Sequence, residues 1–207
     1  LTDSRQVTFP EASLFFALPG RRHDGHQYIV EAYARSVRAF VVSRDLAWGD
    51  FPGATFLRVD DTLTALQQLA AHHRRRFELP VIGITGSNGK TVTKEWLYQL
   101  LYRDYHLLRS PRSYNSQIGV PLSVWLLDDA HDLAVFEAGL SQPGEMERLE
   151  KIIRPTTGLF TNIGPAHQEG FDSYEQKIRE KLRLFRGVER LIYCPDALSA
   201  AWDIAKD

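Results

Sequence analysis

Residues 81–91 read VIGITGSNGKT, an apolar run followed by a glycine-rich turn that ends in Gly-Lys-Thr. This order predicts a buried strand, a phosphate-binding loop and the first turn of a helix. Successive backbone N–H groups in such a loop point at phosphate oxygens, and Gly86 and Gly89 permit a close approach. Lys90 can then reach the β- and γ-phosphates, and the Thr91 hydroxyl can bind Mg²⁺. The stretch therefore predicts a nucleoside triphosphate as the ligand.

One position departs from the strict phosphate-loop pattern, which has glycine where this chain has Ile84. Gly83 stands one residue too early to replace it. A plain surface turn is the alternative interpretation. The β-rich run before the loop and the helical run over 93–102 after it favour the phosphate loop.

Composition limits the classes of protein to consider. The chain has 207 residues, 43% of them hydrophobic and 25% charged, with a formal net charge of -1, which predicts a soluble globular protein of one large or two small domains. This balance argues against nucleic-acid binding, and the basic run 74–76 is interpreted as the solvated end of a helix. No apolar run approaches the ~20 residues of a membrane span. The single cysteine, Cys194, fits a reducing cytoplasm and is expected in the core.

Two domains are expected, at residues 1–76 and 77–207. The first reads as a small α/β unit, and the second alternates strands with helices, which predicts a parallel sheet with helices on both faces. The strands expected are 13–18, 39–42 and 55–59 in the first domain, and 81–84, 105–109, 133–137, 157–162 and 190–194 in the second. The helices expected are 27–36, 62–76, 91–102, 118–127, 144–153 and 173–186.

Polar residues follow the predicted strands at the edge where ligands bind in an open parallel sheet. Glu137 closes an apolar strand and is interpreted as a Mg²⁺ ligand, with a solvent-facing carboxylate as the alternative. Asn162 and His167 follow the next strand, and the residues alone leave His167 equally open to a ligand and a structural role. Lys181 lies in a helix rich in charges, and the residues alone predict one more charge on a solvated face.

Four separated motifs resemble the central ATPase domain of the Mur ligases, the ATP-dependent amide-bond-forming enzymes of peptidoglycan precursor synthesis. Phosphate loops of this family commonly carry an aliphatic residue at the position of Ile84. The motifs are GITGSNGKTVTKE (83–95), SYNSQIGVPLSVWLL (113–127), FEAGLSQPGEME (136–147) and TNIGPAHQEGF (161–171).

The first domain is similar to the UDP-binding domain that the MurE and MurF groups of the family share. This similarity rests on TDSR (2–5), LFFALPG (14–20) and DGH (24–26). Within that pair, the runs 114–121 and 143–145 resemble the MurF group, which adds D-Ala-D-Ala to UDP-MurNAc-tripeptide. The resemblance covers nearly the whole chain.

The resemblance implies a role for each matching residue. Lys90 would hold the β- and γ-phosphates, Thr91 and Glu137 the first Mg²⁺, and His167 a second Mg²⁺. Lys181 would be the lysine that family members carbamylate, which turns a cation into a metal-binding carboxylate. The implied catalytic groups are Lys90, Lys181, His167 and Asn115, and the implied nucleotide-binding groups are Gly86, Ser87, Asn88, Gly89, Lys90, Thr91 and Asn162. The implied substrate-binding groups at the uridine nucleotide are Ser4, Arg5, Phe16, Gly20 and His26.

The implied reaction is transfer of the ATP γ-phosphoryl group to a peptide carboxylate, followed by attack of the D-Ala-D-Ala amine on the acyl phosphate. Another ligase of the superfamily, MurE-like or folylpolyglutamate synthase-like, is one alternative. A non-catalytic nucleotide-binding fragment is the other, because Mur ligases carry a third, C-terminal domain that we expect this chain to lack. We also expect the central domain to be incomplete and these residues alone to turn over little.

Overall fold

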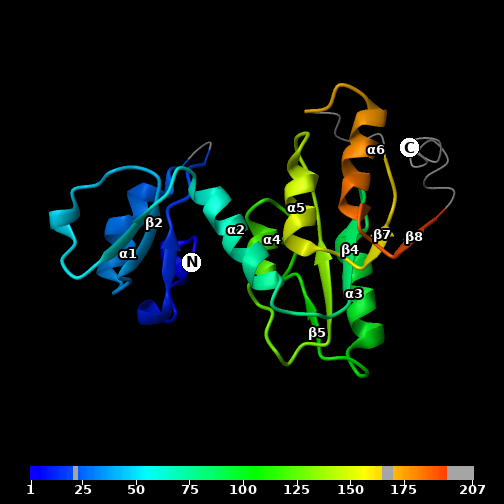
Figure 1. The fold of residues 1–207 in the computed structure, drawn as a ribbon, viewed down its shortest axis with the longest axis horizontal. Coiled ribbons are helices and arrows are strands. Elements are labelled where there is room, and N and C mark those ends of the chain that lie inside the picture. The colour runs from blue at the N-terminus through cyan, green and yellow to red at the C-terminus, as the bar shows by residue number, and fades with distance from the viewer. Residues whose placement is uncertain (21–22, 165–169, 195–207) are drawn as a thin grey trace. The chain divides into compact units, whose positions relative to one another are not determined.

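The computed structural model describes residues 1–20, 23–164 and 170–194. The chain divides into two compact units, Leu1–Leu66 and Gln67–Asp207, and the division falls inside helix α2 (Thr62–Arg74). Figure 1 shows the course of the chain through the elements of both units.

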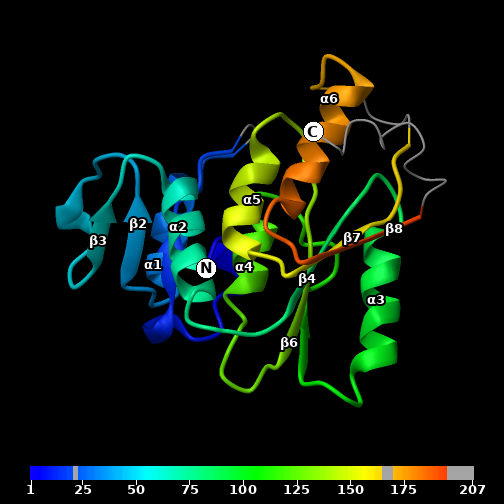
Figure 2. The ribbon, with the colours of Figure 1, turned by 45° about the vertical axis from the view of Figure 1, so that its right-hand side comes forward.

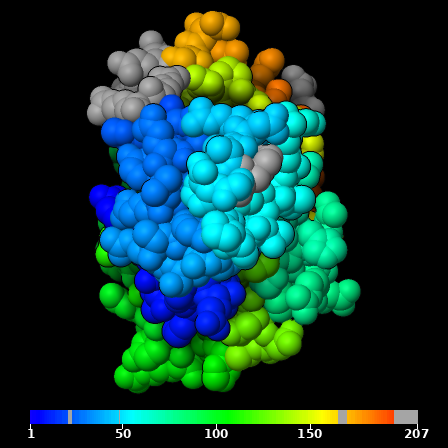
Figure 3. Space-filling view, turned by 90° about the vertical axis from the view of Figure 1, so that its left-hand side faces the viewer, coloured from blue at the N-terminus to red at the C-terminus, as the bar shows by residue number. Residues whose placement is uncertain are grey.

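Unit 1 is built on a three-stranded parallel sheet in the order β1-β2-β3. Helix α1 connects β1 to β2, and aromatic side chains form much of the core: Phe56 stacks on Phe40 at 5.0 Å between ring centroids, and Phe15 meets Phe40 edge-on. Figure 3 shows the surface of this unit in blue to cyan. Its elements are η1 (Ser4–Gln6), η2 (Pro10–Ala12), β1 (Leu14–Phe16), η3 (Gly25–Tyr28), α1 (Ile29–Ala34), β2 (Ala39–Val42), η4 (Trp48–Asp50) and β3 (Thr55–Arg58).

Unit 2 contains a five-stranded, all-parallel sheet in the order β5-β6-β4-β7-β8. All five residues of β6 are buried, as are four of the five in the central strand β4. These strands therefore read as continuous apolar runs, as expected for a sheet covered on both faces. The strands are β4 (Val81–Thr85), β5 (Leu107–Arg109), β6 (Leu133–Glu137), β7 (Thr157–Phe160) and β8 (Arg190–Tyr193).

Helices cover both faces of this sheet, as the sequence predicts. The connection from β4 to β5 crosses the sheet in one direction and the next three connections cross it in the other, so right-handed crossovers place α3 on one face and α4, α5 and α6 on the opposite face. Figure 2 shows α3 apart from α4 and α5, with β4 between them. The helices are α3 (Lys90–Leu101), α4 (Gly119–Val124), α5 (Glu145–Ile153), α6 (Tyr174–Leu182) and the 3-10 turn η5 (Arg183–Phe185). Among the described residues, no helix is both long and apolar enough to cross a membrane.

Most elements are shorter at their ends than the sequence patterns predict. The helix expected over 173–186 ends at Leu182 and continues as the tighter turn η5, and the helix expected over 118–127 covers only Gly119–Val124. Terminal turns of helices commonly tighten or fray, because their last carbonyls lack partners four residues ahead.

The prediction of a solvated basic run is wrong for Arg74, which is only 5% exposed. Its guanidinium donates hydrogen bonds to the carbonyl oxygens of Ile153 (2.9 Å), Arg154 (3.4 Å) and Phe77 (2.6 Å). Carbonyls at the end of α5 have no partner within that helix, so Arg74 satisfies them from α2. Arg75 is exposed, as predicted.

The prediction of a core position for Cys194 is also wrong, because this thiol is exposed. It follows β8, an edge strand on which Arg190 and Ile192 are likewise exposed. The apolar run before the cysteine thus belongs to a strand that is only half covered by the described residues.

Candidate nucleotide and metal site

The loops at the carboxyl ends of the unit 2 strands bring the predicted site together. The phosphate loop leaves β4, the turn 110–116 leaves β5, Glu137 ends β6, and the segment 161–164 leaves β7. Because parallel strands end at one edge of the sheet, four segments far apart in sequence meet there.

The segment after β7 holds the phosphate loop in shape. The Asn162 carbonyl accepts from the Ser87 N–H (2.8 Å), and its side-chain Oδ1 accepts from the Asn88 N–H (3.0 Å). The Thr161 hydroxyl donates to the Asn88 carbonyl (2.6 Å), and the Gly164 N–H donates to Ser87 Oγ (3.0 Å). Asn162 therefore lies beside the predicted nucleotide site, where both of its groups support the loop.

Two glycines of the loop have backbone conformations that side chains disfavour. Gly86 has φ +148°, and a Cβ there would overlap the hydroxyl oxygen of Thr161. Gly89 has φ 81° immediately before the first residue of α3. Both positions consequently need glycine for the chain to turn from β4 into α3.

Two lysines contact the loop, one at the start of α3 and the other on α6. Lys90 Nζ donates to the carbonyls of Gly86 (2.9 Å) and Ser87 (3.2 Å), and Lys181 Nζ donates to the same Gly86 oxygen (2.9 Å). Burial lowers the pKa of Lys181 to about 7, with further lowering by the charges of Lys90 and Lys177. Burial also lowers the pKa of Lys90.

Lys181 is only 4% exposed, so the solvated-face interpretation of this residue is wrong. Helix α6 starts at an N-cap in which Ser173 Oγ accepts from the Gln176 N–H (3.1 Å). The buried Glu180 accepts from the Gly144 N–H (2.8 Å), which fastens α6 to the segment before α5. These contacts turn the face that carries Lys181 toward the phosphate loop.

Glu137 is fully buried, so its alternative interpretation as a solvent-facing carboxylate is wrong. Its Oε2 accepts from the Thr91 hydroxyl over 3.0 Å. Neighbouring ligands of an octahedral Mg²⁺ with bonds of about 2.1 Å lie about 3.0 Å apart, so these two oxygens fit adjacent positions on the ion.

The described residues contain no group of three or more His, Cys, Asp or Glu side chains that could hold a metal by themselves. Mg²⁺ commonly takes one or two carboxylates and completes its shell with water and substrate phosphates, so Glu137 and Thr91 suit it. His167, predicted to bind a second Mg²⁺, lies outside the described residues.

Lys94 belongs to the site although the sequence reasoning missed it. This side chain is completely buried, and its Nζ lies 3.0 Å from Glu137 Oε1. It also donates to the carbonyls of Ser110 (2.8 Å) and Arg112 and lies 3.2 Å from Glu95 Oε1. A lysine within the helical run Thr-Lys-Glu is typical of a surface charge. Its position one helical turn after Lys90 is the signal that could have identified Lys94 as part of the site.

Asn115 lies next to the loop that leaves β6. The Gly139 N–H donates to its backbone carbonyl (2.7 Å), and a Cβ at Gly139 would lie 3.0 Å from Asn115 Oδ1. The Asn115 amide is thus close to the segment that follows Glu137.

In unit 1, the residues predicted to bind a uridine nucleotide differ in their exposure and in the hydrogen bonds that they already make. The buried Ser4 donates to Glu31 Oε2 (3.0 Å), and Phe16 is buried at the end of β1.

The buried His26 uses both ring nitrogens internally: Nε2 accepts from the Ser43 N–H (3.0 Å) and Nδ1 lies 2.6 Å from Asp24 Oδ1. The Gly20 N–H donates to the His23 carbonyl (2.9 Å). Arg5 pairs with Asp3 (2.8 Å), and its side chain is 79% exposed.

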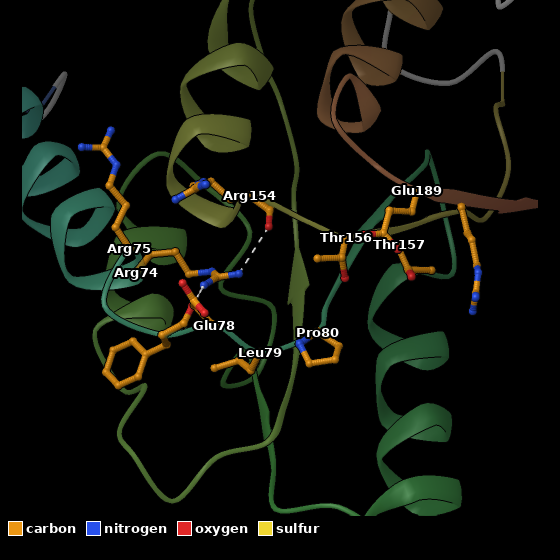
Figure 4. A pocket seen from close by; sticks show the side chains of 11 residues that line it. Arg74, Arg75, Glu78, Leu79, Pro80, Arg154, Thr156, Thr157 and Glu189 are labelled. Atoms are coloured by element: carbon orange, nitrogen blue, oxygen red, sulfur yellow. Dashed lines mark hydrogen bonds between the residues drawn. The ribbon is translucent and has the colours of Figure 1, made fainter.

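A hollow of about 530 Å³ lies at the amino ends of β4, β7 and β8 in unit 2, away from the phosphate loop (Figure 4). Its lining includes Arg74, whose guanidinium is already bonded to backbone carbonyls, together with Pro80, Thr156 and Glu189. Ligands of open parallel sheets bind at the carboxyl ends, so this hollow is separate from the candidate site.

Comparisons with known proteins match both parts of the chain to Mur ligase families. Residues 84–202 match the family described as Mur ligase middle domain, and residues 1–74 match the family described as Mur ligase family, catalytic domain. A UDP-N-acetylmuramoyl-tripeptide--D-alanyl-D-alanine ligase of Bacillus subtilis (strain 168) is 36% identical over 198 residues, which cover 94% of this chain and 43% of the relative. The enzyme of that name from Synechocystis sp. is 40% identical over 166 residues, or 80% of this chain and 36% of the relative.

Two solved structures resemble the chain along nearly its whole length. MurF ligase from Thermotoga maritima in complex with ADP matches with a TM-score of 0.85 and 29% identity, over 100% of this chain and 48% of that one. MurF from Acinetobacter baumannii matches with a TM-score of 0.84 and 31% identity, over 98% of this chain and 46% of that one. The chain spans less than half the length of these relatives. With both units matched, and a buried carboxylate and lysines around its phosphate loop, this chain belongs to the Mur ligase family.

Proposed function

We propose that the complete protein containing this chain is an ATP-dependent, ADP-forming ligase that adds D-Ala-D-Ala to UDP-MurNAc-tripeptide in the cytoplasm. The observation that carries this proposal is the convergence of Lys90, Thr91, Glu137 and Lys181 on one phosphate loop. The names of the relatives support the choice of substrates.

ATP would bind with its phosphates along Gly86, Ser87, Asn88 and Gly89, whose loop opens α3. Lys90 would exchange its carbonyl partners for β- and γ-phosphate oxygens and neutralise their charge. A bound Mg²⁺ would supply further charge neutralisation, held by Thr91 and Glu137. Asn115 and Asn162 would line the site, and His167 would hold a second Mg²⁺.

Lys181 would act after modification by CO₂. Its neutral amine would form the N–C bond and release a proton, leaving a carbamate whose oxygens could face a cation. Its low pKa supports this role, because a neutral amine is then available near pH 7.

The chemistry would proceed in two steps. The γ-phosphoryl group would pass to the terminal carboxylate of the tripeptide, forming an acyl phosphate and ADP. The amine of D-Ala-D-Ala would then attack the acyl carbon, and inorganic phosphate would leave from the tetrahedral intermediate. Catalysis would rest on positioning and on charge stabilisation by the loop and its lysines.

Unit 1 would bind the UDP part of the acceptor. The exposed Arg5 is suited to a phosphate of the nucleotide, while Ser4, Phe16, Gly20 and His26 would shape the pocket around it. His26 would act mainly by holding Ser43 and Asp24 in place.

The test is phosphate release by the complete protein with ATP, Mg²⁺ and UDP-MurNAc-tripeptide, with D-Ala-D-Ala, a diamino acid or glutamate as the amine. We expect phosphate release when D-Ala-D-Ala is the amine and none with the other two amines. Release only with another amine would change the substrate but keep the ligase chemistry. No release with any of them would contradict the proposed reaction.

A further inference from the structure

We propose that Lys94 is a positioning residue that holds one oxygen of Glu137, so that the other is presented beside Thr91 to the divalent cation. The inference rests on the proposed function, and it assigns a role to a charge that this function does not use.

Lys94 and Glu137 form a buried ion pair. Neither Lys94 nor Glu137 exposes any side-chain surface. Charges removed from water are costly unless they are paired in good geometry, so each of these groups depends on the other. The pair also joins the helix that follows the phosphate loop to the end of β6.

The two oxygens of the Glu137 carboxylate have different partners. Oε1 lies 3.0 Å from Lys94 Nζ, and among the described residues it has no hydrogen-bond donor of ordinary geometry. Oε2 accepts from Thr91 over 3.0 Å. With Oε1 held by the ammonium, the carboxylate cannot rotate freely, and Oε2 stays next to the hydroxyl that would share the cation.

The Lys94 ammonium is itself held by the turn after β5. The carbonyls of Ser110 and Arg112 accept from its Nζ, and Ser110 Oγ accepts from the Glu137 N–H (3.2 Å). The turn after β5 thus holds both members of the pair. A purely structural alternative follows from the same contacts, in which Lys94 only fastens this turn.

A double-mutant cycle separates the two roles. Mn²⁺ serves as the probe, and its binding to the complete protein in the presence of ATP is followed by the electron paramagnetic resonance signal of free Mn²⁺. Lys94→Met is expected to weaken Mn²⁺ binding by about ten-fold or more, as removal of groups that orient metal ligands commonly does. In the Glu137→Gln background, Lys94→Met is expected to change Mn²⁺ affinity less than two-fold (about 0.4 kcal/mol).

Lys151→Met is the matched control, because Lys151 is an exposed lysine paired with Glu147 on α5. It should leave Mn²⁺ affinity unchanged. If Lys94→Met does not fold, Lys94→Gln replaces it, since the shorter amide keeps a donor for the turn without the charge; the same loss of affinity is expected.

Two results would overturn the positioning role: wild-type affinity in the Lys94 variants, or an equal loss whether or not Glu137 is present. Failure of the wild-type protein to bind Mn²⁺ with ATP would overturn the proposed metal site itself, together with this inference. The two failures are therefore distinguishable.

Discussion

The ammonium groups of Lys90 and Lys181 donate to one acceptor, the carbonyl oxygen of Gly86, each over 2.9 Å. Two cations on one oxygen repel each other, and the burial of both groups strengthens that repulsion. Burial is the first cause of the lowered pKa of both lysines, and the charge of Lys90 lowers the pKa of Lys181 further. The shared acceptor holds both side chains at the phosphate loop. This contact connects Lys181, on α6, to the phosphate loop, which lies far earlier in the sequence.

The carbamate proposed at Lys181 should depend on pH in the physiological range. The neutral amine is the reactive form, and with a pKa of about 7 it accumulates as the pH rises through 7 and is lost as the pH falls below it. An ordinary lysine, with a pKa of about 10.4, would remain protonated. Carbon-13 NMR of the protein under ¹³CO₂ should therefore show a carbamate signal that grows from pH 6 to pH 8.

This signal should vanish in Lys181→Met and persist in Lys151→Met. A signal that first rises near pH 10, or one that survives the loss of Lys181, would contradict the assignment.

Replacing Lys90 with methionine should remove the charge that faces the ATP phosphates while keeping an unbranched side chain that lacks only the terminal amine. A decrease in ligase rate of about 10²–10³-fold is expected for the loss of one such electrostatic group. Phosphate release under saturating D-Ala-D-Ala measures it, with Lys151→Met as the exposed-lysine control. A decrease below ten-fold would argue against a phosphate-binding role.

Gly86→Ala should disable the phosphate loop without unfolding the sheet. The new methyl group would overlap the Thr161 hydroxyl, and φ +148° disfavours any side chain. Gly187→Ala is the control, because a Cβ at Gly187 would meet no described atom within 4 Å. Fluorescent ATP-analogue binding should be lost in the first variant and retained in the second. Equal affinity in the two variants would show that the loop tolerates the displacement.

Arg74→Met should destabilise the protein, whereas Arg75→Met should not. The first change leaves carbonyls at the end of α5 without their donor and should lower the free energy of unfolding by about 1–3 kcal/mol. Arg75 is exposed, so its replacement should stay within about 0.5 kcal/mol. Urea unfolding monitored by circular dichroism compares the two, and similar losses would contradict the capping role.

Local sequence predicted the small α/β character of unit 1, the parallel sheet of unit 2, the order of strand, phosphate loop and helix, and the place of Glu137 at the end of an apolar strand. Local patterns predict these features. Apolar runs alternate with segments of helical periodicity, and glycines stand at turns whose backbone conformation other residues disfavour. Family resemblance supplied the roles expected of Lys181 and Asn115, which the local pattern alone did not.

Which charges are buried depends on tertiary contacts and not on the local sequence. Lys181, Lys94 and Arg74 all lie in charged or polar stretches that read as solvated helix faces, yet each is 5% exposed or less. Their partners, Gly86, Glu137 and Ile153, are distant in the sequence or belong to other elements. A charge can be buried only where such partners compensate its lost hydration, and folding alone brings those partners within reach.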